Sequence, residues 1–194
     1  RMELSLHITG IFNVYNVMSA VGAALAEHIA PADIRAALSA FTAVPGRFEL
    51  VKAGQDFTVI VDYAHTPDGV ENVLRTARKI AKRHIIAVFG CGGDRDRTKR
   101  PIMGRLAGEL ADVVIATSDN PRSEDPEAIL REVEAGVEET IGAKHHEKIT
   151  DRREAIFRAV ELAQPDDIVV ILGKGHEDCQ ILTDKTTHFG DTAQ

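Results

Sequence analysis

The first 44 residues carry a helical pattern of apolar positions. From Phe12 to Leu25 apolar residues recur at helical spacing, and Asn13 is an acceptable N-cap, so this stretch predicts a buried, alanine-rich helix. Residues 31–41 predict a second helix, with a proline suited to its first turn and three apolar residues on one face: Ile34, Leu38 and Phe41. Two helices therefore open the chain.

The period of the pattern changes after Val44-Pro45-Gly46-Arg47. Proline and glycine punctuate a chain, so we place a domain boundary here, between residues 1–44 and 45–194. If a new domain begins here, the two helices have lost the partner that once covered their apolar faces. We therefore expect their apolar side chains to form an exposed patch through which the chain can self-associate, with three members: Phe12, Val17 and Leu25.

Beyond the boundary, strand-length and helical patterns alternate. Apolar runs of strand length are found at Thr58–Tyr63, Ile85–Phe89, Val113–Thr117 and Ile168–Leu172. Helical patterns lie between them, at about 67–82, 101–110, 126–141 and 153–163. This order predicts an α/β fold with a mostly parallel sheet and helices on both faces, in which ligands bind beyond the carboxyl ends of the strands.

Polar side chains follow all four predicted strands. The loops that carry them are residues 62–68, 90–101, 118–122 and 173–178. Any one of these loops has an ordinary structural interpretation, since Asp and Asn cap helices and Gly makes turns. Four such loops at one sheet edge instead indicate a ligand site.

The glycine-rich loop after the second strand lacks the known nucleotide motifs. Arg95 occupies the place of the third glycine, so the dinucleotide fingerprint G-x-G-x-x-G fails. The P-loop pattern is absent as well, because Gly173-Lys174-Gly175 has neither its spacing nor its hydroxyl. The loop nevertheless predicts an anion site, since four cations follow its glycines: Arg95, Arg97, Lys99 and Arg100.

The segment Asp119-Asn120-Pro121-Arg122 suits a zwitterionic amino acid. Proline stiffens a turn that holds an amide and a guanidinium fork, and we expect Arg122 to bind a carboxylate. Glu177 supplies the opposite charge for an ammonium group. Asp119 alone is interpreted as a helix or turn cap.

Composition narrows the function classes further. The chain has 44% hydrophobic and 27% charged residues and no apolar run long enough for a membrane span, so we expect a soluble globular protein. A net charge of −7 disfavours broad binding to nucleic acid or acidic membranes. Two cysteines, Cys91 and Cys179, indicate a reducing cytoplasm and no disulfide scaffold.

His145 and His146 are predicted to be surface residues of a polar loop rather than metal ligands. Residue 1 is Arg, and we expect the sequence to be a fragment.

Six segments, in this order, resemble the Mur ligases, the ATP-dependent amide ligases of peptidoglycan precursor synthesis. They are Gly10–Asn16, Pro45–Glu49, Asp62–Asp68, Gly90–Pro101, Asp119–Arg122 and Gly173–Glu177. The resemblance covers essentially the whole chain. It implies a Rossmann-like, amino-acid-binding domain over residues 45–194, preceded by the helical tail of the central ATPase domain over residues 1–44. Asp-Asn-Pro-Arg resembles the form of the motif that selects meso-2,6-diaminopimelate rather than lysine.

The resemblance also implies a reaction. With ATP and Mg2+, the D-Glu side-chain carboxylate of UDP-MurNAc-L-Ala-D-Glu becomes an acyl phosphate, which the amine of diaminopimelate attacks. Asn16 would contact adenine, Arg47 the ATP phosphates and Asp62 the ribose, and His65 would lie close to the nucleotide as a catalytic candidate. Diaminopimelate would be held by Arg95, Asp119, Asn120, Pro121, Arg122, Gly173 and Glu177.

The same resemblance implies that the P-loop, the UDP-sugar domain and most Mg2+ ligands lie outside this sequence, so no metal ligand is assigned here. We expect these residues alone to be inactive. Two alternatives stay open: a lysine-adding or folylpolyglutamate-type ligase domain, and a non-catalytic Rossmann-like nucleotide-binding module.

Overall fold

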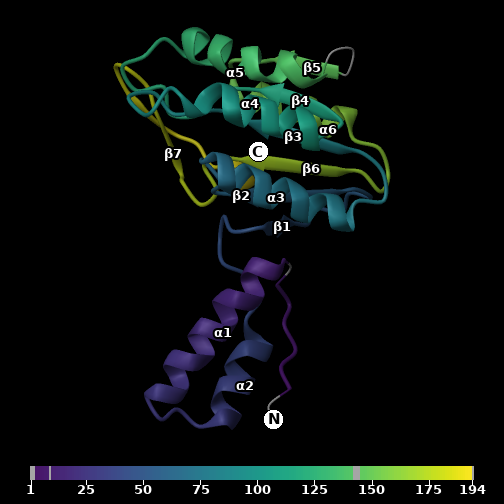
Figure 1. The fold of residues 1–194 in the computed structure, drawn as a ribbon, viewed down its shortest axis with the longest axis vertical. Helices are drawn as coiled ribbons and strands as arrows, with labels where there is room; N and C mark the ends of the chain where they lie inside the picture. Colours follow the sequence, from purple (N-terminus) through teal and green to yellow (C-terminus); the bar gives the residue numbers. More distant parts are fainter. Residues whose placement is uncertain (1–2, 9, 142–144, 194) are drawn as a thin grey trace. The chain divides into compact units, whose positions relative to one another are not determined.

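The computed structural model of the 194-residue chain describes residues 3–8, 10–141 and 145–193 (Figure 1). The described chain divides into two compact units, Arg1–Val44 and Pro45–Gln194. Among the described residues, no helix has the length and apolar character that a membrane crossing requires.

The first unit holds the two predicted helices, α1 (Ile11–Ala26) and α2 (Pro31–Ala40). The prediction of Asn13 as the N-cap is wrong, because α1 already begins after Gly10, whose φ of 100° is readily adopted only by glycine. Asn13 is instead buried inside the first turns of the helix and accepts a hydrogen bond from Asn16 at 3.3 Å. Asn16 itself is exposed.

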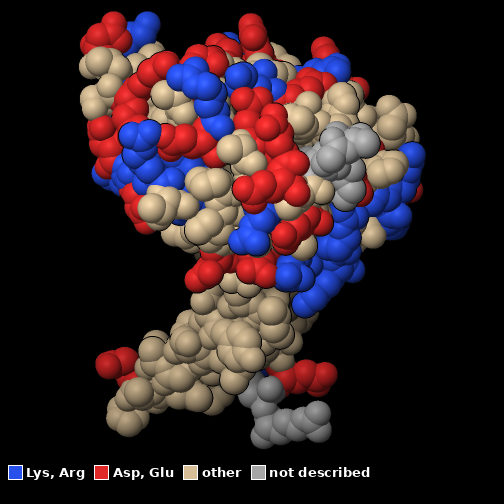
Figure 2. Space-filling model, turned by 45° about the horizontal axis from the view of Figure 1, so that its top comes forward, with Lys and Arg blue, Asp and Glu red and all other residues tan. Residues whose placement is uncertain are grey.

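The apolar patch of α1 differs from its predicted composition. Val17 is buried with 6% of its surface exposed, so it does not belong to the patch, whereas Leu25 is exposed as predicted. The more exposed members are Ile11, Tyr15 and Met18. In Figure 2 the visible face of this unit carries few charged side chains. Self-association through these helices stays a prediction.

The second unit is built on a six-stranded sheet in the order β1-β2-β6-β3-β4-β5. Its strands are β1 (Glu49–Val51), β2 (Thr58–Asp62), β3 (Ile85–Phe89), β4 (Val113–Ala116), β5 (His145–Lys148) and β6 (Ile168–Leu172). All neighbouring strands are parallel except β1, which runs antiparallel to β2 at the edge. The carboxyl ends of β2, β6, β3 and β4 therefore lie next to one another.

Helices cover both faces of this sheet (Figure 1). They are α3 (Pro67–Ile80), α4 (Lys99–Leu110), α5 (Pro126–Ile141) and α6 (Arg152–Leu162). Alternate residues of the strands, such as Val61, Val88 and Ile171, form one apolar face and pack against α6. The predicted α/β fold with a mostly parallel sheet and helices on both faces is confirmed.

The structure adds short strands that the pattern does not predict. Besides β1 and β5, a hairpin of β7 (Cys179–Ile181) and β8 (Thr186–His188) follows the last sheet strand, and a 3-10 turn covers Asp191–Ala193. The interpretation of His145 and His146 as loop residues is wrong, because they lie in β5, paired with β4. This edge strand, His-His-Glu-Lys, has no apolar alternation to reveal it.

Candidate functional site

The four polar loops meet at the carboxyl edge of the sheet, as predicted from the alternation of strands and helices. They surround a pocket of about 240 Å3. Its lining residues come from all four loops: Tyr63, His65, Gly92, Arg95, Lys99, Asp119, Asn120, Arg122, Gly173 and Glu177. The lining mixes cations, carboxylates and one amide, so the pocket suits a ligand with charges of both signs.

The turn after β6 places a lysine inside the protein and a glutamate in the pocket. Gly173 has a φ of 115°, and a Cβ at this position would lie 2.4 Å from the Asp119 carboxylate, so the turn requires glycine here. The backbone N–H of Glu177 donates to the carbonyl of Lys174 at 2.9 Å and closes the turn. Lys174 is fully buried, and its Nζ donates to Glu177 Oε2 at 3.0 Å.

The amide of Asn120 joins the loops after β4 and β6. Its Oδ1 accepts from Lys174 Nζ at 3.1 Å and from the backbone N–H of Ile181 at 2.9 Å. Its Nδ2 donates to Glu177 Oε2 at 2.9 Å. Asn120, Lys174 and Glu177 therefore form one hydrogen-bonded cluster beside the pocket, which we call the Lys174 cluster.

Asp119 is buried, with 7% of its surface exposed. Burial raises the pKa of its carboxyl group, although the charges of Arg152 and Lys174 oppose the shift. Arg152 is fully buried at the start of α6 and binds the Asp191 carboxylate through two hydrogen bonds of 2.8 and 2.7 Å. It also donates to the carbonyl of Leu172, immediately before the glycine turn.

Arg122 lies at the pocket wall in a left-handed backbone conformation, with a φ of 54°. Its Nη1 donates to the carbonyls of Gly93 and Asn120, at 2.9 and 3.3 Å, and so connects two loops. Only this one nitrogen of the guanidinium group is used in these bonds, so the group retains further donors toward the pocket.

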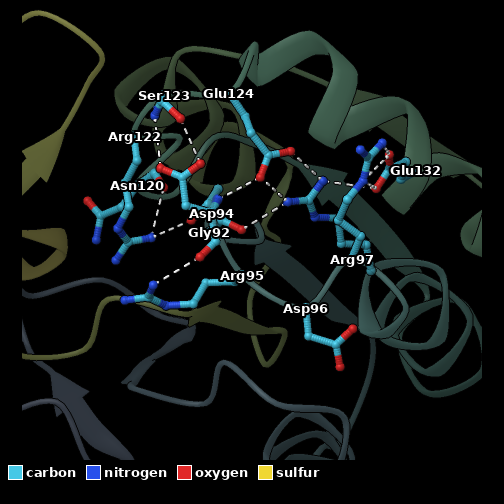
Figure 3. A network of polar contacts seen from close by, with 12 residues as sticks. Gly92, Asp94, Arg95, Asp96, Arg97, Asn120, Arg122, Ser123, Glu124 and Glu132 are labelled. Carbon is cyan, nitrogen blue, oxygen red and sulfur yellow. Dashed lines mark hydrogen bonds and ion pairs between the residues drawn. The ribbon is translucent and has the colours of Figure 1, made fainter.

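The predicted anion site of the glycine-rich loop contains two different kinds of cation. Figure 3 shows Arg97 beside Glu132, and Arg100 donates to Glu124 at 2.7 Å and to Glu132 at 2.9 Å. The assignment of Arg97 and Arg100 to an anion site is therefore wrong: their charges are neutralised within the fold.

Two other cations of the loop face the pocket. Arg95 is exposed and donates only to the preceding carbonyl, of Asp94, among the contacts that the described residues make (Figure 3). Lys99 lines the pocket and donates to the carbonyl of His65 at 3.3 Å. Arg95 and Lys99 thus remain as the loop's candidates for binding an anion.

A carboxylate network holds the loop against the following turn. Glu124 accepts from two nitrogens of Arg100 and from the backbone N–H of Asp94. These hydrogen bonds lower the pKa of Glu124 to about 2. Asp94, with a φ of 54°, in turn accepts from the hydroxyl and backbone N–H of Ser123. We call the ion pairs of Arg97 and Arg100 with Glu124 and Glu132 the Arg100 cluster.

Aromatic and basic side chains gather beyond β2. The Arg47 guanidinium lies over the Tyr63 ring at 4.8 Å, and the rings of His65 and His176 lie 4.7 and 5.3 Å from the same ring. The Nδ1 atom of His65 is 2.9 Å from the Tyr63 carbonyl. Since a carbonyl accepts, Nδ1 donates and Nε2 is left as the acceptor of the neutral ring.

Asp62 is buried at the end of β2. Its two carboxylate oxygens accept from the backbone N–H groups of Phe48 and Ala64, both at 2.7 Å. Burial raises the pKa of Asp62, and these two hydrogen bonds oppose the shift. Asp62 therefore connects the Pro45-Gly46-Arg47 turn to the sheet. Asn16 belongs to the other compact unit.

The described residues contain no group of three or more His, Cys, Asp and Glu that would suit a metal ion. Cys91 is buried in the glycine-rich loop, and burial raises the pKa of its thiol to about 12, so the thiol has little thiolate character near neutral pH.

Three members or supports of this site are not predicted by the sequence pattern: Lys174, Tyr63 and Arg152. Lys99, in contrast, belongs to the predicted anion site and lines the pocket. The two glycines that flank Lys174 are the available signal for it, since they indicate a tight turn with a side chain forced inward. Nothing in the sequence around Arg152 indicates its pairing with Asp191, 39 residues later.

Comparison with known proteins places this site in a family. The family described as "Mur ligase, glutamate ligase domain" matches residues 46–175. A protein of Geobacillus thermodenitrificans named UDP-N-acetylmuramoyl-L-alanyl-D-glutamate--2,6-diaminopimelate ligase is 54% identical over 99% of this chain and 39% of its own length. A protein of the same name from Syntrophomonas wolfei is 51% identical over 98% of this chain and 39% of its length.

Solved structures agree with these matches. A structure of a ligase of the same name is 40% identical, with a TM-score of 0.74 over 98% of this chain and 38% of that chain. Folylpolyglutamate synthase of Mycobacterium tuberculosis, complexed with ADP and AMPPCP, is 27% identical, with a TM-score of 0.68 over 89% of this chain and 39% of that chain. The chain thus spans about two fifths of the length of the curated relatives and solved structures that it matches.

Proposed function

The chain belongs to the Mur ligase family, and from this premise we propose that it is the amino-acid-binding part of a ligase that adds meso-2,6-diaminopimelate to UDP-MurNAc-L-Ala-D-Glu. The observation that carries the proposal is the pocket, which brings a guanidinium, an amide and a carboxylate from separate loops together. The activity is proposed for this chain joined to an ATPase region that carries a P-loop. Its substrates and ATP imply a cytoplasmic location.

Diaminopimelate fits the charges of the pocket. The amino acid carries two carboxylates and two amino groups, and the pocket offers three cations, Arg95, Lys99 and Arg122, beside the Glu177 carboxylate. Arg122 would bind the far carboxylate that lysine lacks, since its guanidinium retains donors beyond the two backbone contacts. Glu177 would bind an ammonium group. The remaining members of the predicted set would shape the pocket: Asp119, Asn120, Pro121 and Gly173.

The nucleotide would bind beside the Tyr63 ring. Arg47 is exposed and unpaired with any carboxylate in the contacts of the described residues, which suits an ATP phosphate. The lone pairs that Asp62 does not use for Phe48 and Ala64 would accept from the ribose, and His65 presents Nε2 as a proton acceptor near the nucleotide. Asn16 of the first unit would contact adenine.

The family resemblance places most Mg2+ ligands outside this sequence, so no step of the reaction is assigned to a metal held by this chain. What the chain contributes is positioning. A bound amine held by the pocket meets the activated carboxylate at a fixed place, which removes much of the entropic cost of the encounter. Because the P-loop pattern is absent from the sequence, we expect the 194 residues alone to neither hydrolyse ATP nor form the amide.

A chimeric enzyme tests the function. In it, this chain replaces the matching part of the Geobacillus thermodenitrificans relative, with which it shares 54% identity. Amide formation is measured with meso-2,6-diaminopimelate, lysine and glutamate as the incoming amino acid, on UDP-MurNAc-L-Ala-D-Glu and on folate. We expect kcat/KM for diaminopimelate to exceed that for lysine by about tenfold or more, the scale of one charge-assisted hydrogen bond. Preference for lysine would support the lysine-adding alternative, and glutamate transfer to folate would support the folylpolyglutamate-type alternative.

A further inference from the structure

Lys174 is a buried cation whose hydrogen-bond partners belong to the pocket. Its side chain is fully buried, whereas the Glu177 side chain is 30% exposed. An ammonium group in the interior is costly unless charged and polar partners compensate it. Among the described residues, the hydrogen-bond partners of Lys174 Nζ are Asn120 and Glu177, both of which line the pocket. The same two side chains therefore stabilise the buried ammonium group of Lys174 and form part of the ligand pocket.

We propose, on the basis of the function proposed above, that Lys174 is a positioning residue that fixes the Asn120 amide and holds Glu177 as a permanent anion for the ligand's ammonium group. In this assignment Glu177 does not accept the proton of the reacting amine. Lys174 acts through its two partners and does not touch the ligand, because its side chain is fully buried.

The orientation of Asn120 follows from the donors around it. Lys174 Nζ and the Ile181 N–H both donate to one atom of the amide, which must be the oxygen. A flipped amide would place its NH2 group against two donors. Nδ2 is therefore directed at Glu177, and Lys174 determines which face of the amide the pocket presents.

Glu177 is placed by the same ammonium group. Its Oε2 accepts from both Lys174 and Asn120, while Oε1 carries no hydrogen bond from the described residues. One oxygen is thus used to hold the side chain, and the other is available to a ligand. The ammonium group on Oε2 lowers the proton affinity of the whole carboxylate, so this arrangement suits a group that binds a cation better than a general base.

The charges that face Glu177 favour its ionised form. Lys174 from the same turn and Arg122 from the loop after β4 are cations, Arg152 of α6 adds a buried positive charge, and Asp119 adds a negative one. Burial by itself would raise the pKa of Glu177, but the hydrogen bonds from Lys174 and Asn120 outweigh it and the pKa is lowered.

The test compares variants of the 194-residue chain by amide NMR titration with meso-2,6-diaminopimelate at about pH 5.5 and about pH 8, a range above the ordinary pKa of glutamate. In Lys174→Met, Glu177 loses its cation and keeps its burial, so its pKa rises and a larger share of the side chain is protonated at the lower pH than in the wild-type chain. We expect the ratio of affinities between the two pH values to grow at least about threefold over that of the wild-type chain.

Three controls isolate the role of Lys174. Lys174→Arg keeps a cation and should keep the wild-type ratio. Lys82→Met removes an exposed lysine paired with Asp166 at 2.8 Å, outside the pocket, and should also keep it. Lys174→Met combined with Glu177→Gln should return to the ratio of Glu177→Gln alone, which also subtracts any contribution of the histidines near the pocket. An equal loss at both pH values in Lys174→Met, or a double variant that retains the enlarged ratio, would overturn the proposal.

A second measurement, the pKa of Glu177 in the ligand-free wild-type chain, does not depend on whether Lys174→Met folds. The side-chain carboxyl carbon of Glu177 is followed by NMR as pH is lowered, and it is assigned by comparison with Glu177→Gln. We expect a midpoint below the ordinary value of 4.5; a midpoint at or above it would overturn the role of Lys174. If diaminopimelate fails to bind the wild-type chain, the proposed function fails, whereas a midpoint at or above 4.5 overturns the role of Lys174 whether or not the ligand binds.

Discussion

The Lys174 cluster and the Arg100 cluster are both built on a fully buried cation at the same edge of the sheet, yet they serve different ends. The partners of Lys174, Asn120 and Glu177, line the pocket, and Glu177 keeps an oxygen for a ligand. The carboxylate partners of Arg100, Glu124 and Glu132, bind arginines or loop backbone and do not line it. A basic residue near a strand end thus indicates a ligand site only where the side chains around it have polar atoms that make no hydrogen bond within the protein.

The largest expected effect is a loss of stability when Arg100 is replaced. Arg100→Met leaves Glu124 and Glu132 without the cation between them, and breaking a buried pair by removing one partner costs about 3 kcal/mol. Partial exposure of the two carboxylates, 23% and 27%, places the expected loss at the low end of the usual range. Urea unfolding followed by circular dichroism measures it.

Arg105 provides the matched control, since it is exposed on the same helix, α4. Arg105→Met should change the free energy of unfolding by less than about 0.5 kcal/mol. Equal losses of unfolding free energy in the two variants would contradict the structural role assigned to the Arg100 cluster.

The next effect is on specificity, at Arg122. A charge-assisted hydrogen bond to a buried carboxylate contributes roughly 1.5 to 3 kcal/mol, or about ten- to a hundredfold in affinity. Arg122→Ala should therefore weaken diaminopimelate binding by that factor and leave lysine binding nearly unchanged, as measured by titration of both amino acids. Because Arg122 also holds the carbonyls of Gly93 and Asn120, equal losses for the two ligands would mean that it only supports the loops.

The smallest effect is a pH dependence at Glu124. Its pKa is about 2 in the folded protein against an ordinary value of 4.5, so its contribution to stability is full above about pH 4.5 and is lost as pH falls toward 2. The free energy of unfolding of the wild-type chain should decline more steeply between pH 5 and pH 2 than that of Glu124→Gln. Parallel curves for the two proteins would contradict the ion pairing of Glu124 with Arg100.

The sequence predicts the central sheet and the position of the site well. Ile85–Phe89 and Ile168–Leu172 are continuous apolar runs, which is typical of strands buried on both faces, and both strands have the predicted bounds. Once these strands are parallel, their carboxyl ends must be neighbours, and the convergence of the four loops follows. The edge strands β1 and β5 have no such pattern and were missed.

The charges within the site could not be separated by sequence alone. The glycine-rich loop carries four basic residues close together in the sequence: Arg95, Arg97, Lys99 and Arg100. Two of them are neutralised by Glu124 and Glu132, which lie in another loop and another helix. Lys174 was overlooked because its role depends on Asn120, 54 residues earlier in the chain. Such pairings are set by the packing of the loops, which local patterns do not encode.

The central claim is that the pocket recognises both ends of diaminopimelate, and amide NMR titration of the wild-type chain tests it most directly. We expect meso-2,6-diaminopimelate to shift the amide signals of residues 92–95, 119–122 and 173–177, and to bind at least about tenfold more tightly than lysine. Equal affinity for the two amino acids, or shifts confined to residues outside these three loops, would contradict the account.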